Sequence, residues 1–223
     1  MTLSKLYVPT FKRLYSPGEL LADGVVHVVA IVAGLIAFAV LFSRIAATGE
    51  AGNGVVVAIY AAGFFLMFGF SCAYNMTPPS QLKWLLRRFD HAAIYIMIAG
   101  TYTALVSQME DRFWAWILLA VVWSGAIGGS MMKLFLPGRW TRVSTALYLA
   151  LGWVVIVAIR PVTLSLPTTT MILVAVGGLV YSIGVVFYKW ESLKFQNAIW
   201  HSCVAVAAGC HYAGIAYVVA RAA

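Results

Sequence analysis

Seven apolar stretches, separated by short polar connections, dominate the pattern of hydrophobic and polar positions in this chain. Each is close to the ~20 residues that a helix needs to cross a hydrocarbon core of ~30 Å. Pro78-Pro79 follows the second stretch and Glu110-Asp111 the third, and both pairs interrupt the apolar pattern. The pattern predicts an all-α, polytopic membrane protein with one seven-helix domain over residues 24–219, its helices covering residues 24–43, 54–73, 90–107, 113–132, 144–159, 168–188 and 197–219.

The basic residues are distributed unequally among the eight segments outside these stretches. In chain order the segments hold 3, 1, 3, 1, 3, 1, 2 and 1 Lys or Arg residues, so the odd-numbered segments hold 11 of the 15. Short loops rich in Lys and Arg stay in the cytoplasm. The distribution therefore predicts a cytoplasmic N-terminus and a C-terminus outside the membrane.

The two ends of the chain are short. Residues 1–23 mix basic and apolar side chains, which predicts a cytoplasmic segment lying along the membrane surface. No apolar core of a signal peptide precedes Pro17, so we expect no cleaved leader. Residues 220–223 are expected to form a small external tail. In a bacterial cell, this topology places the protein in the inner membrane.

Composition excludes several classes of protein. The chain is 63% hydrophobic and 10% charged, with a mean hydropathy of +0.92, so no separate soluble domain is expected. Most of the net charge of +8 falls in the predicted cytoplasmic loops, where its partner is anionic lipid rather than nucleic acid. Cys72, Cys203 and Cys210 lie inside apolar stretches, and their odd number argues against a disulfide framework. The sequence predicts no oligomeric state.

Polar residues at membrane depth indicate a functional site, because such groups are costly in lipid. The predicted topology brings those of four helices to the cytoplasmic leaflet, where we expect one polar pocket. Several follow an i, i+4 spacing that places them on one helical face. Helix capping is the alternative explanation for Glu19, Asp23 and Asp90. The expected pocket residues are Glu19, Asp23, His27, Ser71, Asn75, Asp90, His91, Tyr95, Asn197 and His201.

These residues carry a resemblance to a known family. The segment Arg-Arg-Phe-Asp-His-Ala-Ala-Ile-Tyr at 87–95, leading into Ile-Ala-Gly-Thr-Tyr-Thr at 98–103, resembles the signature of the hemolysin III family. That family belongs with the adiponectin and progestin receptors (PAQR proteins) and is related to alkaline ceramidases. Residues 19–27, 71–75, 178–184 and 197–201 are similar to its other motifs in order and spacing. The resemblance covers about residues 16–215.

The resemblance implies a zinc ion near the cytoplasmic face, held by three histidines, and hydrolysis of a lipid amide or ester. One histidine follows the serine of the second helix by four residues, and two form an H-x-x-x-H on the seventh. In this chain those positions hold Asn75, Asn197 and His201. Only His201 matches, and amides are poor zinc ligands, so we expect no tightly bound zinc. A set of His27, Asp90 and His201 is the alternative that keeps a zinc site open, with Glu19, Asp23 and His91 as further rescue ligands.

Several functions agree with these residues. The first is a membrane protein that senses lipid or a small ligand, or maintains membrane lipid state, with the polar residues binding a head group. A metal-dependent lipid hydrolase is the alternative, with Asp90 as base or water-orienting residue and Ser71 as its helper. A pore-forming cytolysin is a second alternative, suggested by the family name. A proton-linked transporter is a further one, although polar groups confined to one leaflet argue against a continuous path.

Overall fold

The chain is almost entirely helical in the computed structural model, which describes residues 15–49, 51–136 and 141–222. Seven segments of these residues are long and apolar enough to cross a membrane. The predicted all-α, multi-pass membrane architecture is therefore confirmed. The elements are α1 Pro17–Thr48, α2 Ala51–Met76, α3 Gln81–Val106, α4 Arg112–Phe135, α5 Thr141–Gly152, the 3-10 helix η1 Val154–Ala158, α6 Ile159–Ser165, α7 Thr168–Lys189 and α8 Gln196–Ala222.

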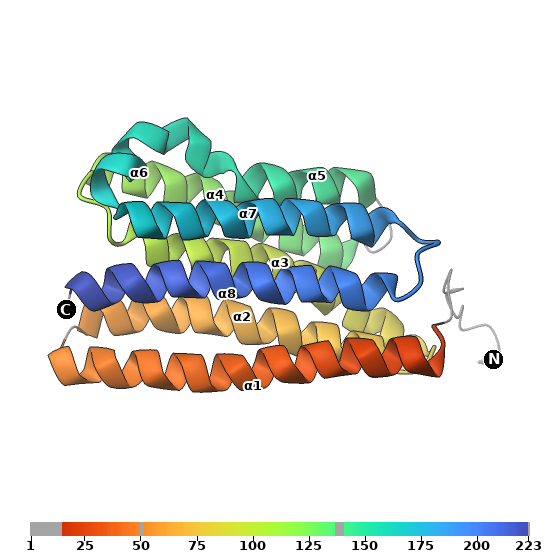
Figure 1. Cartoon of the computed structure of the whole chain (residues 1–223). Helices are drawn as coiled ribbons and strands as arrows, with labels where there is room; N and C mark the ends of the chain where they lie inside the picture. Colours follow the sequence, from red (N-terminus) through yellow and green to blue (C-terminus); the bar gives the residue numbers. More distant parts are fainter. Residues whose placement is uncertain (1–14, 50, 137–140, 223) are drawn as a thin grey trace, which may run out of the picture.

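The helices form one bundle with roughly aligned axes, and α1 begins at the end of the bundle opposite to the one where α8 ends (Figure 1). α1 packs against α2 and α8, α2 against α3, α3 against α4, and α7 against α8. α3 is central, and every residue from Ala99 to Val106 is buried. The end where α1 begins is called the N-terminal end of the bundle below. α3 and α8 also begin there, and α2, α4 and α7 end there.

α1 begins at Pro17, before the predicted start at residue 24, because the sequence there caps a helix. Ser16 Oγ accepts a hydrogen bond from Glu19 N (3.3 Å), and Glu19 Oε2 accepts one from Ser16 N (2.9 Å), which is a capping box. Pro17 suits the first position, where its missing N–H needs no partner. Glu19, Asp23 and His27 therefore share one helical face. Residues 1–14 lie outside the described residues, so the surface segment stays a prediction.

α3 begins at Gln81 rather than at the predicted residue 90. Ser80 caps it by accepting a hydrogen bond from Lys83 N (3.1 Å). The Lys83 ammonium group donates to carbonyl oxygens at the end of α2, including that of Thr77 (2.7 Å). Asp90 consequently lies inside α3 and does not cap it.

The fifth membrane span is broken where the sequence predicted one short helix over residues 144–159. η1 interrupts it, and the Tyr102 hydroxyl accepts a hydrogen bond from Val155 N (3.0 Å) and donates one to Gly152 O (3.0 Å). Tyr102 thus satisfies backbone groups that water cannot reach in a membrane. Pro161, just beyond the predicted end at residue 159, lies in the first turn of α6, where a proline is tolerated. The helix therefore continues to Ser165.

The α2–α3 contact is close enough to bring the two backbones together. A Cβ atom on Gly63 would lie 3.0 Å from Met97 Cα, and one on Gly100 would lie 3.0 Å from Ile59 O. In lipid, helices associate through such close packing rather than through the hydrophobic effect. At both positions glycine allows the contact.

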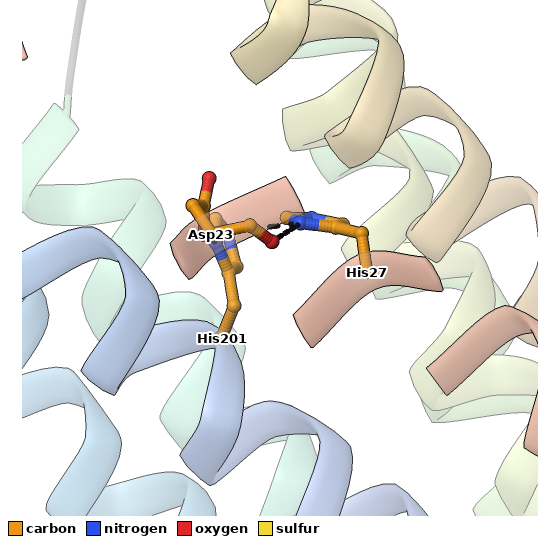
Figure 2. Close-up of side chains that lie close together, drawn as sticks. All are labelled: Asp23, His27 and His201. Carbon is orange, nitrogen blue, oxygen red and sulfur yellow. Dashed lines mark hydrogen bonds and ion pairs between the residues drawn. The ribbon is translucent and has the colours of Figure 1, made fainter. Parts of the chain in front are cut away.

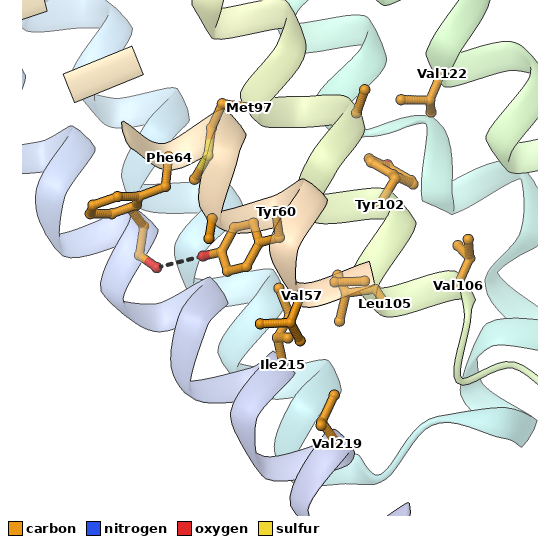
Figure 3. Close-up of a cluster of buried hydrophobic side chains, with 14 of the residues drawn as sticks. Val57, Tyr60, Phe64, Met97, Tyr102, Leu105, Val106, Val122, Ile215 and Val219 are labelled. Carbon is orange, nitrogen blue, oxygen red and sulfur yellow. Dashed lines mark hydrogen bonds between the residues drawn. The ribbon is translucent and has the colours of Figure 1, made fainter. Parts of the chain in front are cut away.

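The half of the bundle away from the N-terminal end is packed with apolar side chains (Figure 3). Val57, Leu105 and Ile215 come from α2, α3 and α8 and are buried there. The Tyr60 hydroxyl donates to Ala208 O (3.4 Å). This apolar half contrasts with the N-terminal half, where the buried ionisable groups lie.

Candidate functional site: a buried polar cluster at the N-terminal end of the bundle

Two ionisable side chains of α1 are almost completely buried. Asp23 is 1% exposed and His27 is 0% exposed. His27 Nδ1 lies 2.8 Å from the Asp23 carbonyl oxygen, one turn earlier in the helix. The other face of α1 carries exposed apolar residues such as Leu21 and Val29. α1 therefore turns its polar face inward and its apolar face outward, as a membrane requires.

Both carboxylate oxygens of Asp23 are bonded to side chains of α8. His201 Nδ1 lies 2.6 Å from Asp23 Oδ1, and Asn197 Nδ2 donates to Asp23 Oδ2 (3.0 Å). Figure 2 shows the His27 and His201 rings approaching Asp23 from two different helices. The first and last membrane helices are thus joined through one buried carboxylate.

Ser71 of α2 lies between the two imidazoles. Its Oγ is 3.0 Å from His27 Nε2 and 3.2 Å from His201 Nε2. The two rings are 4.4 Å apart between centroids, at an angle of 64°. α1, α2 and α8 therefore meet at a single hydroxyl group.

The partners of these histidines determine where the imidazole protons lie. Nδ1 of His27 faces a carbonyl oxygen and Nδ1 of His201 faces a carboxylate, so each Nδ1 carries a proton. Both Nε2 atoms then face the hydroxyl of Ser71, which can donate to only one of them. One additional proton or one bound cation completes the arrangement and balances the negative charge of Asp23.

Two asparagines connect the rest of the cluster. Asn75 Nδ2 donates to Ser71 O (2.9 Å) and lies 3.3 Å from Ser71 Oγ. Asn197 Nδ2 donates to Asn75 Oδ1 (2.9 Å) as well as to Asp23. The two amides therefore orient the carboxylate on one side and the serine on the other, and they pair with each other.

Six of the ten expected residues are joined in this hydrogen-bonded cluster, and Asp90 lies beside it. The carboxylate of Asp90 interacts electrostatically with Ser71 and His201. Glu19 lies elsewhere: Oε1 accepts a hydrogen bond from Phe195 N (3.1 Å), and Oε2 belongs to the capping box of α1. Glu19 thus fastens the start of α1 to the connection between α7 and α8.

Tyr95 faces another helix, and His91 is bonded to that helix through its backbone. The Tyr95 hydroxyl is 3.0 Å from Ser144 Oγ of α5, and its ring packs against Tyr148. His91 Nε2 lies 3.8 Å from Asp90 Oδ2. Its carbonyl oxygen accepts a hydrogen bond from the Tyr148 hydroxyl (3.4 Å). These two residues belong to the contact of α3 with α5.

The donor atoms of the cluster fit a metal ion. Among the residues that the structure describes, Asp23, His27 and His201 each bring one ligand atom, and these atoms lie within 4.8 Å of one another. Two imidazoles and one carboxylate are a ligand set of catalytic zinc, which keeps a fourth position open. Asn197 orients Asp23 from outside the set, as supporting residues of metal ligands do. The donors present therefore suit zinc, although they are not the histidines that the resemblance implies.

Comparison with known proteins gives the family. The family model described as Haemolysin-III related matches residues 20–212. This chain belongs to the haemolysin-III related family. It is similar to Hemolysin-3 of Bacillus cereus, with 34% identity over 183 residues that cover 82% of this chain and 84% of that protein. It is also similar to the Hemolysin-3 homolog of Bacillus subtilis (strain 168), with 33% identity over 191 residues, 86% of this chain and 90% of that one.

A more distant similarity agrees with the wider PAQR superfamily. The Homo sapiens Monocyte to macrophage differentiation factor is 29% identical over 165 residues, which cover 70% of this chain and 67% of that protein. Within this haemolysin-III related protein, the positions at which the resemblance implies histidine hold Asn75 and Asn197. Both lie in the cluster, where they support Asp23 and Ser71 instead of offering imidazoles.

The sequence predicts a catalytic role for Asp90 and places Asp23 among the pocket residues. Asp23 bonds to His201 directly, whereas Asp90 acts on the cluster from its edge. The i, i+4 spacing of Asp23 and His27 was the signal for their shared face. Lys133, which lies just beyond the predicted helix over residues 113–132, is buried in the last turn of α4.

Proposed function

We propose that this protein is a metal-dependent hydrolase that cleaves an amide or ester bond of a membrane lipid. Asp23, His27 and His201 would hold the metal ion in place of three histidines. The observation that carries the proposal is the convergence of these three ligand atoms within 4.8 Å, in a buried cluster between membrane-spanning helices. A lipid substrate suits a site with that position, because the reacting bond need not leave the membrane.

The residues around the ligands suit hydrolysis. Bound zinc would supply a Lewis acid for polarising a carbonyl group at neutral pH. The carboxylate of Asp90 can accept a proton, and its interaction with Ser71 places it next to the cluster. Ser71 Oγ is held between two imidazoles and an amide, so it can orient a water molecule or a substrate oxygen. Asp90 and Ser71 are thus the residues proposed to handle protons.

The change of ligands alters the charge of the site. Three histidines are neutral ligands, whereas the set proposed here contains the carboxylate of Asp23. The site with its metal ion would therefore carry one less positive charge. Asn197 donates to Oδ2 of Asp23 and leaves Oδ1 to face His201. Because both oxygens of Asp23 are hydrogen-bonded, binding of a metal ion through Oδ1 would replace the bond to His201 Nδ1.

Metal analysis together with an assay tests the proposal. The full chain is purified in detergent, zinc is measured by mass spectrometry, and hydrolysis of fluorescent lipid amides and esters is followed with and without a chelator. His201→Asn removes a ligand, and His211→Asn is the matched control, since His211 is another histidine of α8 and bonds to Val174 O. We expect stoichiometric zinc in the wild type and the control but not in His201→Asn. Wild-type protein that contains no zinc, and whose hydrolysis of these lipids is unchanged by the chelator, would contradict the proposal.

A second candidate is a lipid or small-ligand sensor without turnover. Its support is that each buried polar side-chain atom of the cluster has a neighbour at hydrogen-bond distance: among the described residues, the buried side-chain atoms without a partner are Arg88 Nε and the Tyr181 hydroxyl, both outside the cluster. A lipid-dependent change in stability without hydrolysis would favour this candidate. A pore has less support, because the other half of the bundle is apolar around residues such as Val57 and Ile215.

A further inference from the structure

The connection between α7 and α8, residues 190–195, lies at the N-terminal end of the bundle, where α1 begins (Figure 1). It is called the α7–α8 strap below, and most of its residues are exposed. The backbone N–H of Phe195, its last residue, donates a hydrogen bond to Glu19 Oε1 of α1 (3.1 Å). Gln196, the first residue of α8, accepts a hydrogen bond from the Tyr15 hydroxyl (3.4 Å). The strap and the start of α8 are therefore bonded to the residues around the start of α1.

The contact of α1 with α8 continues inward from the strap to the polar cluster. Glu19 and Asp23 lie one turn apart on one face of α1, and the exposed fraction falls from 8% to 1% between them. Asp23 bonds to Asn197 and His201 of α8. The bond between Glu19 and Phe195 lies nearer to the end of the bundle. The strap therefore closes the α1–α8 contact on its outer side.

Phe195 has a backbone conformation that is unfavourable for a residue with a side chain. Its φ is 58°, in the left-handed region, and no other non-glycine residue that the structure describes has a positive φ. Such a conformation persists only where surrounding contacts hold it. The hydrogen bond from the Phe195 N–H to Glu19 is a contact of this kind. Loss of the bond would therefore release the strap from a strained conformation.

The polar cluster needs a route by which water-soluble groups can reach it. Asp23 and His27 are almost completely buried. The half of the bundle away from the N-terminal end is packed with apolar side chains such as Val57 and Ile215. A polar solute therefore has its shortest polar route at the N-terminal end. Displacing the strap there breaks the bond to Glu19 and leaves the apolar half packed.

We propose that the α7–α8 strap is a gate over the polar cluster, held closed by Glu19. In the closed form, Glu19 Oε1 holds the N–H of Phe195, and α1 and α8 enclose Asp23. In the open form this bond is broken, Phe195 returns to a negative φ, and polar solutes reach the cluster. Local opening of this kind needs less free energy than global unfolding. The proposal does not depend on whether the cluster binds a metal ion or hydrolyses a lipid.

Access of a water-soluble reagent to position 71 tests the gate. Ser71→Cys is introduced into the full chain after Cys72, Cys203 and Cys210 have been replaced by alanine, and the protein is placed in lipid nanodiscs. The rate at which a charged methanethiosulfonate reagent modifies the thiol is measured by mass spectrometry. We expect Glu19→Ala to raise this rate roughly tenfold to a hundredfold, as for the loss of one charged hydrogen bond.

Two controls separate opening of the strap from other effects of Glu19→Ala. Ser16→Ala removes the hydroxyl of the capping box but keeps the bond between Glu19 and Phe195, so we expect little change in the rate at position 71. Val57→Cys, in place of Ser71→Cys, reports on the apolar half, where modification should not respond to Glu19→Ala. An equal increase in either control would overturn the proposal, because it would indicate a loosened helix cap or bundle.

Phe195 provides a second test that leaves the capping box intact. Phe195→Gly and Phe195→Ala both remove the ring and keep the N–H, but glycine adopts a positive φ far more readily than alanine. We expect roughly tenfold slower modification at position 71 in Phe195→Gly than in Phe195→Ala, because glycine favours the closed form. Equal rates in these two variants, or no increase in folded Glu19→Ala protein, would overturn the proposal.

Discussion

Asp23 Oδ1 lies 2.6 Å from His201 Nδ1, which bonds a carboxylate in the second turn of α1 to an imidazole 178 residues later in α8. The other oxygen of Asp23 accepts a hydrogen bond from Asn197. Because Asp23 is buried, these bonds form in a medium where they are strong and where their loss is costly. The same carboxylate therefore ties two helices together and serves as a proposed metal ligand.

Replacing Asp23 by Asn should affect both roles. In Asp23→Asn the amide is a poor zinc ligand, and its NH2 group would oppose either Asn197 Nδ2 or His201 Nδ1. We expect zinc affinity to fall by at least about a hundredfold and stability to fall by about 1–3 kcal/mol. Zinc titration and thermal unfolding in detergent measure the two effects. Glu110→Gln, at an exposed carboxylate, is the control, and unchanged zinc affinity in Asp23→Asn would contradict the ligand assignment.

The two asparagines permit a rescue experiment. If the family resemblance identifies the ligand positions correctly, Asn75→His together with Asn197→His rebuilds a three-histidine set with His201. We expect this pair of substitutions to restore zinc binding to Asp23→Asn, because the new imidazoles would replace the lost carboxylate. Zinc content of the triple variant checks this. Zinc content of the triple variant no higher than that of Asp23→Asn would contradict this expectation.

Packing at the α3–α4 contact gives a prediction with a built-in control. A Cβ atom on Gly129 would overlap the ring of the fully buried Tyr95, whereas one on Gly128 meets no atom within 4 Å. Gly129→Ala should cost about 1–3 kcal/mol through forced displacement of the ring. Gly128→Ala should cost no stability, because alanine has a higher helix propensity than glycine. The unfolding temperatures of the two variants are measured under the same conditions. Equal stability of the two would contradict the described contact.

The break in the fifth membrane span depends on one hydroxyl group. In Tyr102→Phe the backbone groups of Gly152 and Val155 lose their partner. Leaving them unsatisfied should cost about 1–3 kcal/mol. Tyr217→Phe removes a hydroxyl that bonds to the exposed Arg221 and should have little effect. If both variants unfold at the same temperature as the wild type, the Tyr102 hydroxyl does not stabilise the break in the fifth span.

Much of the fold could be predicted because a membrane imposes a simple rule on helix length. Hydropathy located all seven spans, but it placed the start of α3 at residue 90. The first turns of α3 contain Lys83, Arg87 and Arg88, which lower its hydropathy although they are helical. Ser80 directly after two prolines was the local signal for the true start, as a helix-capping residue.

The broken fifth span could not be predicted from local sequence. Its run of Val154, Val155, Ile156 and Val157 is as apolar as a membrane helix, so hydropathy does not detect a 3-10 turn there. The break is sustained by Tyr102, which lies on α3. Only the packing of α3 against this span reveals it.

The site was predictable in its parts but not in its connections. The i, i+4 pairs on α1, α2 and α8 indicated which residues share a face. The choice of Asp23 over Asp90 depends on α1 packing against α8, a contact between the first and last helices of the chain. The hydrogen bond between Asn75 and Asn197 agrees with the high cost of unpaired amides in lipid.

Anomalous X-ray diffraction at the zinc edge, on the full chain purified with zinc, tests the central claim most directly. The account predicts one zinc peak about 2.0–2.2 Å from an oxygen of Asp23 and from one nitrogen each of His27 and His201. A structure with no zinc in this cluster, or with zinc held by other residues while the Asp23–His201 hydrogen bond persists, would contradict it.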